Sequence, residues 1–449
     1  MRFGLESGGL HASVVIDTGF PATIGRDYTS RTDELGTGEG GMTRARESAD
    51  LVVVGAGAVG GWASAFAKSG GMQRVIVLER GLAGQGASSR AAGVVRAQGG
   101  NPSTVRLGSW SVDFYNSQRQ LYGTDSGFQE LGYLILAVTQ ADVRNGRERV
   151  AMQREAGLDV SWLDERGAVR VNPTLAPQGH RGGSYVGTDG FIDPPRNVRA
   201  YSLAMQRAGV ELRERTPFLG LRTRTGRGGS PTVTGVETPE GTIATARVLL
   251  TGGPTLRPLG RLVGAEVFVG AARHQVVVSE PHPAFEDVRL PMVFDIRSGL
   301  YWRQEEGGLL WGMSNPDEAP GEAQRIDWSY LRKMQRRLGR LVPITQALGI
   351  RKAWAATIEF TPDHMPILGP VVRRDGTAIE GATLASACGH GMMWGPSVAR
   401  IAADLVAEGE TSVIDDVEEF GMNRFDERGR SRLAADPIAL PFPVSADGE

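Results

Sequence analysis

Short apolar runs alternate with glycine-rich turns along most of the chain, and the first of them sets the pattern. Leu51–Val54 and Val75–Leu78 are uninterrupted apolar runs, and between them a glycine turn leads into residues with helical spacing. Apolar runs of this length, bounded by turn residues, predict buried strands. We therefore expect Asp50–Arg80 to form a strand, a helix and a second strand.

The same criteria predict elements along the rest of the chain. Asp193 followed by two prolines is typical of a helix start, and Glu305–Gly308 separates two apolar runs as the turn of a hairpin would. Strands are predicted at Leu131–Val138, Val210–Arg213, Thr232–Val236, Arg247–Thr251, Val267–Glu280, Met292–Asp295, Leu300–Arg303 and Leu309–Met313. Helices are predicted at Ser103–Leu121, from Val138 to about Ala156, at Val198–Ala208, Trp328–Leu341 and Pro396–Ala407.

The order of these elements alternates between α/β and β-rich stretches, which predicts a mixed α/β fold with a discontinuous Rossmann-like nucleotide-binding domain. Its segments are predicted at 48–128, 184–254 and 355–410. An antiparallel β-sheet substrate domain, 129–183 and 255–354, is inserted between them. Residues 1–47, rich in Gly, Thr and charges, are predicted to be a disordered extension, and 411–449 a C-terminal tail. Met42 stands just before the first strand and is an expected alternative start.

Composition narrows the function classes. The net charge of −2 and the absence of a basic block argue against nucleic acid. Leu51–Ala67 is interrupted by glycines, so we expect no membrane span. One cysteine, Cys388, excludes internal disulfides and, with no signal peptide evident, favours the cytoplasm. Six scattered histidines and one cysteine make a metal site improbable.

The turn after the first strand carries the clearest chemistry. Gly55, Gly57 and Gly60 form G-x-G-x-x-G, and Glu79 ends the second strand. This spacing is typical of a dinucleotide site, in which the helix N-terminus faces a pyrophosphate and the acid accepts ribose hydroxyls. The charge of Glu79 would repel a 2′-phosphate, so FAD or NAD is expected rather than NADP.

Three further segments are suited to contact with a cofactor. Gly86–Gly100 is small and polar apart from Arg90 and Arg96, and Arg96 could pair with a flavin or with a substrate carboxylate. The strand ending at Gly252 and the turn Gly389-His390-Gly391 bring backbone close to a ligand, and the second opens a helix. The expected cofactor-binding residues are Gly55, Gly57, Ala58, Val59, Gly60, Glu79, Arg80, Ser88, Ser89, Gly252, Gly389, His390, Gly391 and Met392.

Together with TPDHMPILG (Thr361–Gly369) and CGHGMMWGP (Cys388–Pro396), these motifs make residues 48 to 410 resemble the D-amino-acid oxidase-type FAD oxidoreductases. Sarcosine oxidase (monomeric and β subunit), dimethylglycine dehydrogenase and glycine oxidase are the nearest members. The resemblance implies an FAD domain of glutathione-reductase type and oxidation of a C–N bond by hydride transfer to the flavin, followed by hydrolysis of the imine.

The resemblance also suggests catalytic residues. Arg96, His364, His390 and Trp311 are candidates, with His274 as a weaker one. Tyr301, Trp302 and Trp311 on the predicted hairpin could form a wall over the flavin.

Three departures from the family pattern limit what carries over. Leu310 takes the place of a lysine that activates oxygen, so electrons could pass to O2 or to a carrier. Ala356 replaces a cysteine that tethers flavin, and 80–100 contains no histidine, so FAD is expected to be non-covalent. Met393 replaces a lysine that binds the sarcosine carboxylate, which favours a larger or less acidic amine.

Two alternatives stay open: a flavin-dependent alcohol or 2-hydroxy-acid dehydrogenase on the same fold, and a non-catalytic flavin-binding subunit or assembly factor. The substrate, the acceptor and the choice between homo- and hetero-oligomer are not encoded in any local pattern.

Overall fold

The structure, a computed structural model, describes residues 47–226 and 229–439. The predicted disordered extension, apart from Glu47, and the alternative start at Met42 lie outside the described residues.

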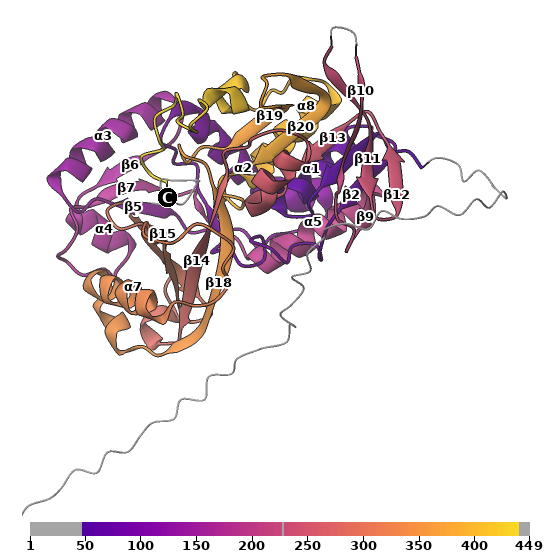
Figure 1. The fold of residues 1–449 in the computed structure, drawn as a ribbon. Helices are drawn as coiled ribbons and strands as arrows, with labels where there is room; N and C mark the ends of the chain where they lie inside the picture. The colour runs from indigo at the N-terminus through magenta and orange to yellow at the C-terminus, as the bar shows by residue number, and fades with distance from the viewer. Residues whose placement is uncertain (1–46, 227–228, 440–449) are drawn as a thin grey trace, which may run out of the picture. The chain divides into compact units, whose positions relative to one another are not determined.

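The described residues form eight α-helices and twenty strands, most of which are labelled in Figure 1. The helices are α1 (Ala58–Ser69), α2 (Pro102–Tyr122), α3 (Gln140–Glu155), α4 (Glu165–Val171), α5 (Pro194–Ala208), α6 (Leu256–Leu262), α7 (Trp328–Leu341) and α8 (Gly395–Ala407). The strands are β1 (Leu51–Val54), β2 (Val75–Leu78), β3 (Val94–Val95), β4 (Gln129–Glu130), β5 (Tyr133–Leu136), β6 (Ser161–Leu163), β7 (Gly183–Val186), β8 (Gly190–Phe191), β9 (Glu211–Arg213), β10 (Gly220–Thr225), β11 (Pro231–Thr238), β12 (Gly241–Ala244), β13 (Val248–Leu250), β14 (Gly270–Ser279), β15 (Met292–Asp295), β16 (Leu300–Glu305), β17 (Gly308–Met313), β18 (Ile350–Phe360), β19 (Ile367–Val372) and β20 (Ala378–Ser386).

A nine-stranded sheet has a parallel centre. Its order is β10-β11-β20-β13-β1-β2-β9, with β12 and β19 added at β11 and β20. The pairs from β20 to β9 are parallel, whereas β10, β12 and β19 pair antiparallel. The carboxyl ends of β1, β2 and β13 therefore meet at one edge, where parallel α/β sheets bind ligands.

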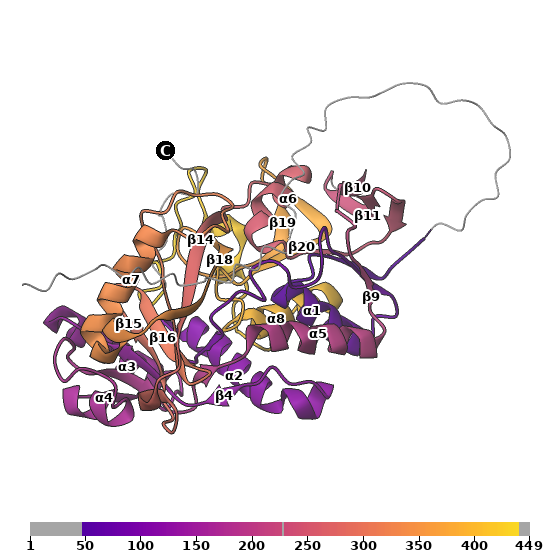
Figure 2. The same ribbon diagram turned by 90° about the horizontal axis from the view of Figure 1, so that it is seen from below.

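Successive side chains of the central strands point alternately into two different apolar layers. Leu51 and Val53 pack with α1, α2, α5 and α8, which lie together in Figure 2, while Val52 and Val54 face the layer that includes β11 and α6. Strands with apolar residues on both faces are what a parallel sheet covered on both sides requires. The continuous apolar runs in the sequence follow from this burial.

An eight-stranded sheet, in the order β18-β14-β17-β16-β15-β5-β7-β6, is built from the stretches between these segments. All its pairs are antiparallel except β5 with β15, which joins the two inserted stretches. The structure places β7 and β18 in this sheet, although residues 184–186 and 355–360 were predicted for the nucleotide-binding domain.

The two faces of the eight-stranded sheet have different neighbours. Leu134, Trp302 and Trp311 pack with α7 on one face, while Tyr133 and Tyr301 belong to the apolar cluster on the other. Because successive strand residues point to opposite faces, one position along the chain decides whether an aromatic ring lies in the core or toward the open face. A three-stranded sheet, β3-β8-β4, completes the described fold.

Most predicted elements are confirmed within a few residues, and several match at both ends. Strands β1, β2 and β15 and helix α7 have the predicted bounds. Asp193 caps α5 by accepting from the Arg196 amide at 3.1 Å. No helix among the described residues is long and apolar enough to cross a membrane.

The segment after α8 is more than the predicted tail. Ile414 and Phe420 are buried in the core that contains α1 and α8. The fully buried Arg424 contacts the carboxylate of Asp363 at 2.7 and 3.1 Å. Burial opposes ionisation of Asp363, but the hydrogen bonds and charge of Arg424 outweigh it and hold the pKa of Asp363 below its usual range. This ion pair fastens the segment to the turn after β18.

Replacing Arg424 should therefore unfold the chain at a lower temperature. Removing one partner of a buried ion pair costs about 3–5 kcal/mol, because the other charge stays buried and unpaired. We expect Arg424→Gln to lower the thermal midpoint by several degrees, and the stability that the pair contributes to be lost as pH falls through the pKa of Asp363. The control is Arg430→Gln, which removes an exposed partner of Asp426. Equal midpoints for the two variants would contradict the structural role of the buried pair.

Candidate functional site

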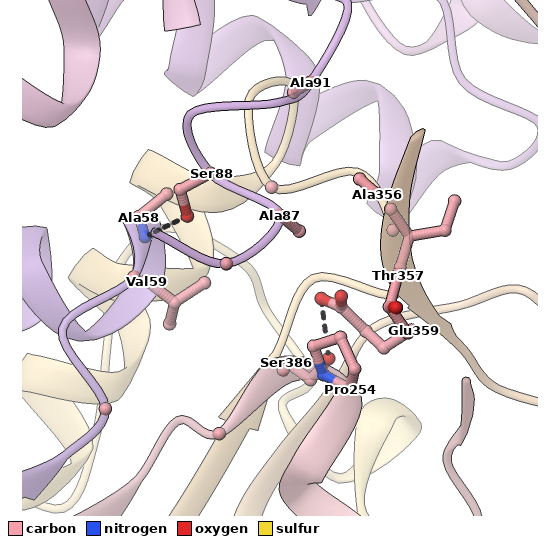
Figure 3. Close-up of a pocket in the computed structure, with 18 of the residues that line it drawn as sticks. Ala58, Val59, Ala87, Ser88, Ala91, Pro254, Ala356, Thr357, Glu359 and Ser386 are labelled. Carbon is pink, nitrogen blue, oxygen red and sulfur yellow. Dashed lines mark hydrogen bonds between the residues drawn. The ribbon is translucent and has the colours of Figure 1, made fainter. Parts of the chain in front are cut away.

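A cavity of about 670 Å³ extends from the carboxyl edge of the nine-stranded sheet to one face of the eight-stranded sheet. Figure 3 shows part of its lining: the start of α1 and the loop through Ala87 and Ser88 on one side, and β18 on the other. One end thus contains the predicted dinucleotide motif, and the other contains side chains of the β-rich stretches.

The glycines of the motif are required by contacts and not only by the sharpness of the turn. Gly55 has φ +103°, and a Cβ there would lie 2.8 Å from the carbonyl oxygen of Thr251. At Gly60 a Cβ would lie 2.0 Å from the Gly55 carbonyl oxygen. Side chains are excluded at both positions, so α1 begins directly beside the ends of β1 and β13.

Glu79 connects the two turns at this end. Its carboxylate accepts from the amides of Ala56 at 2.9 Å and Gly81 at 2.8 Å. A carboxylate has about four acceptor sites, so ribose hydroxyls can be accepted beside these amides. Arg80 also lines the cavity, with an exposed side chain 3.6 Å from Glu322.

Ser88 closes the loop over the start of α1. Its hydroxyl accepts from the amide of Ala58 at 2.9 Å (Figure 3), and a Cβ at Gly57 would lie 3.3 Å from the same oxygen. Ala58 and Val59 line the cavity at the positive end of the α1 dipole. This is the arrangement that a pyrophosphate requires.

The middle of the cavity contains a buried acid that the sequence analysis did not select. Glu359 on β18 accepts from the hydroxyl of Ser386 at 3.3 Å (Figure 3). Burial raises the pKa of Glu359, although the Gly389 amide and Ser386 oppose this. Gly252 and Gly253 lie alongside. No local pattern marks Glu359, because its place depends on where β18 crosses the cavity.

The turn before α8 contributes Gly389, His390, Gly391 and Met392 to the lining. His390 is buried, its Nδ1 lies 2.7 Å from the Cys388 carbonyl oxygen, and its ring centroid is 4.4 Å from that of Trp394. Burial and the charge of Arg96 lower the pKa of His390 to about 3. The imidazole is therefore neutral, and its proton on Nδ1 donates to the carbonyl, which leaves Nε2 as an acceptor.

Cys388 is held in the left-handed region at φ 50° by this turn, and burial raises the pKa of its thiol to about 12. Its Sγ lies 3.1 Å from the amide of Thr361. A buried thiol of this pKa is no nucleophile at neutral pH, so its role is to connect two turns that flank the cavity.

His274 on β14 and Tyr301 on β16 form a pair at the other end. His274 Nε2 lies 2.6 Å from the Tyr301 hydroxyl, and the Ser314 hydroxyl lies 3.3 Å from Nδ1. Burial lowers the pKa of His274 to about 4 and raises the pKa of Tyr301. Both groups are therefore neutral at physiological pH.

The pair exists because β17, which lies between β14 and β16, has a glycine opposite Tyr301. A Cβ at Gly312 would lie 2.1 Å from the Tyr301 hydroxyl. The missing side chain lets the phenol reach across one strand to the histidine on the next. The sequence analysis considered His274 and Tyr301 separately; the signal it missed was the glycine at that register position.

Arg96 lines the cavity near this pair and is almost wholly buried. Its guanidinium donates to the carbonyls of Gln98 and, at 3.0 Å, of Ile438, and lies 5.8 Å from the centre of the Tyr133 ring. Burial raises the pKa of nearby Asp189 to about 7, although the Ala97 amide and the charge of Arg96 oppose this. Two of the donors of Arg96 are thus engaged by the main chain.

Several selected residues do not line the cavity. His364 is in the turn after β18, with φ 59°. Trp302 and Trp311 are cross-strand partners that pack toward α7, on the face away from Tyr301, so the proposed wall over the flavin contains only Tyr301. Gly60 acts through packing, and the Ser89 amide donates to the Gly84 carbonyl. Of the family departures, Ala356 and Met393 line the cavity, and Leu310 is buried in the cluster with Tyr301.

These features fit a long ligand with a phosphate centre. The glycine turn, the α1 N-terminus and Glu79 would hold an adenosine and its pyrophosphate, and the cavity continues past Glu359 and the start of α8 to the histidine–tyrosine pair. Within 47–226 and 229–439, no group of three His, Cys, Asp or Glu side chains could hold a metal ion.

Comparisons with known proteins agree with this site. A family model described as FAD dependent oxidoreductase matches residues 50–405. The chain is 27% identical over 387 residues to glycine oxidase of Geobacillus kaustophilus, which covers 84% of this chain and 97% of that one. It is 26% identical over 384 residues to 4-methylaminobutanoate oxidase (formaldehyde-forming) of Paenarthrobacter nicotinovorans, covering 82% of this chain but 45% of the other. The chain thus spans less than half of some curated relatives.

Among solved structures, L-proline dehydrogenase from P. horikoshii superposes with a TM-score of 0.77 at 25% identity, over 86% of this chain and 100% of that one. The family match spans both sheets and every residue that lines the cavity except Ile438. The chain belongs to the FAD dependent oxidoreductase family, and FAD is its cofactor.

Proposed function

We propose that the protein oxidises the C–N bond of an amine or amino acid. The supporting observation is a single cavity that joins the dinucleotide turn to the neutral His274–Tyr301 pair. The related proteins are named for glycine, 4-methylaminobutanoate and L-proline, all of which are amino acids. An N-alkyl amino acid or a less acidic secondary amine is the proposed substrate class. The imine product would hydrolyse to a carbonyl compound and a smaller amine.

FAD, when bound, would supply a hydride acceptor for oxidation at the carbon next to nitrogen. The chain's own contribution at the substrate end is to hold the amine neutral. An ammonium group loses hydration in a cavity lined by Tyr133, Phe294 and Tyr301, and this burial favours the uncharged amine. The Tyr301–His274 pair offers a hydrogen bond to that amine but is a poor proton acceptor, because the pKa of His274 is about 4. Solvent takes the proton before the amine is bound.

Binding of FAD is proposed to be non-covalent. Ala356, directly opposite His274 on β18, has no nucleophilic atom, and the Cys388 thiol is buried against Thr361. The acceptor of the electrons is O2 or an electron carrier. Leu310 in place of a charged side chain near Tyr301 favours the carrier.

An anaerobic screen of the purified flavoprotein tests the function. Glycine, N-methylglycine, N,N-dimethylglycine, 4-methylaminobutanoate, L-proline and uncharged secondary amines would each be mixed with it, together with matched 2-hydroxy acids. We expect at least one amine to bleach flavin absorbance and no hydroxy acid to do so. Bleaching by hydroxy acids alone would replace the proposal with the alcohol-oxidising alternative, and the absence of bleaching would support the non-catalytic one. Admission of air then distinguishes an oxidase from a dehydrogenase.

Removal of the Tyr301 hydroxyl should weaken the chemical step but not cofactor binding. We expect Tyr301→Phe to lower kcat/KM by about tenfold, which corresponds to one hydrogen bond of about 1.4 kcal/mol. Gly312→Ala, which displaces the phenol, should do the same. In both variants and in the parent, kcat/KM should rise with pH as the free substrate loses its proton, without an inflection from His274 above pH 5. Trp302→Phe, on the opposite face, is the control. A pH profile of kcat/KM that shows no change at the pKa of the free substrate would contradict this mechanism.

At the other end, Glu79→Gln should weaken FAD binding. The amide keeps one acceptor oxygen but places a donor against one of the two backbone amides that Glu79 now accepts. We expect the Kd for FAD, measured by fluorescence titration of the apoprotein, to rise at least about tenfold, as the loss of a charged hydrogen bond of about 1.5–3 kcal/mol implies. Glu237→Gln, at an exposed partner of Arg222 outside the cavity, is the control. An unchanged Kd would place the adenosine elsewhere.

A further inference from the structure

The segment after α8 returns to the substrate end of the cavity. In Figure 1 it is the yellow trace that leaves α8 and reaches the region of β5. Its last described part, residues 433–439, contains Ile438, which is 1% exposed and packs in the cluster of Tyr133, Phe294 and Tyr301. Ile438 also lines the cavity.

The segment after α8 is anchored at several points along its path. Asp363 holds three of its residues: its carboxylate pairs with Arg424 and accepts from the Ser431 hydroxyl, and its carbonyl accepts from the Asp436 amide at 3.1 Å. Asp436 in turn accepts from the Ile438 amide at 3.0 Å. The position of Ile438 is therefore determined by the TPD turn that follows β18.

Arg96 fixes the other side of Ile438. Its Nη2 donates to the Ile438 carbonyl at 3.0 Å, and the rest of the guanidinium is held by the Gln98 carbonyl. A substrate carboxylate that approached Arg96 would have to share it with this carbonyl. The side chain of Ile438 meanwhile belongs to the apolar cluster that contains Tyr301 and lines the end of the cavity where a substituent of the substrate would lie.

We propose that Ile438 is a specificity-determining residue: as the end wall of the substrate pocket, it limits the size of the apolar group that can lie beside Tyr301. The proposal rests on the proposed function only in assuming that this group belongs to an amine. The packing of Ile438 and its contact with Arg96 act on any ligand that enters this end of the cavity.

The test changes the size of the wall in the intact flavoprotein. The quantity compared is the ratio of kcat/KM for the N-benzyl derivative to kcat/KM for the N-methyl derivative of the best amine from the screen. Ile438→Ala should raise this ratio by at least about tenfold, because one or two methylenes in a pocket have an effect of that size. Ile438→Phe should lower that ratio. The matched control is Ile414→Ala, which removes the same atoms from a buried isoleucine in the same segment but outside the cavity.

Binding of neutral probes separates the two proposals. The Kd values of benzyl alcohol and 2-naphthalenemethanol can be measured from the change in flavin absorbance. Relative to the parent, Ile438→Ala should favour binding of the larger probe, and Ile438→Phe should favour binding of the smaller one. If no amine reduces the flavin but the ratio of the two Kd values still changes in this way, the proposed function is wrong and the role of Ile438 is supported. The inference would be overturned if amine oxidation stayed intact and the ratios of kcat/KM and of Kd in both position-438 variants equalled those of Ile414→Ala. Ile438→Val serves where the alanine variant does not fold.

Discussion

The close packing of α1 against the ends of β1 and β13 is the constraint on which the site depends. Thr251, at the end of β13, donates to the carbonyls of Val54 and Gly55 at 2.9 and 3.1 Å, and Gly60 leaves no room for a side chain beside Gly55. This contact aligns the helix N-terminus with the carboxyl edge of the parallel sheet. Because Glu79 hydrogen-bonds to the turn between β1 and α1, the second strand is held in the same arrangement.

From that edge the cavity extends into the eight-stranded sheet, where burial determines the chemistry. His274, Tyr301 and His390 are all far from water, and their environment favours the neutral form of each. Arg96 is the exception: its buried guanidinium donates to main-chain carbonyls. These surroundings, neutral donors and acceptors with one engaged cation, are consistent with the uncharged amine proposed as substrate. Met393, which is uncharged, also lines the cavity.

The segment after α8 connects the cofactor end to the substrate end. Asp363 belongs to the turn that follows β18, yet its partners Arg424, Ser431 and Asp436 carry the chain back to Tyr301. A change at Asp363 would therefore affect both stability and the shape of the substrate pocket. The buried ion pair is costly to desolvate and specifies one path for a segment with little regular structure.

The local sequence pattern was sufficient to predict those parts of the fold that a few consecutive residues determine. The strands β1 and β2, helix α7, the cap at Asp193 and the glycine turn were all predictable, since hydrophobic period and turn chemistry act over short distances. Only the tertiary structure showed that Trp302 and Trp311 face α7 while Tyr301 faces the cavity, because the face of a strand depends on register and on what covers the sheet. The Tyr301–His274 contact, Glu359 and Ile438 likewise depend on strands and segments that are distant along the chain, and no local period encodes such meetings.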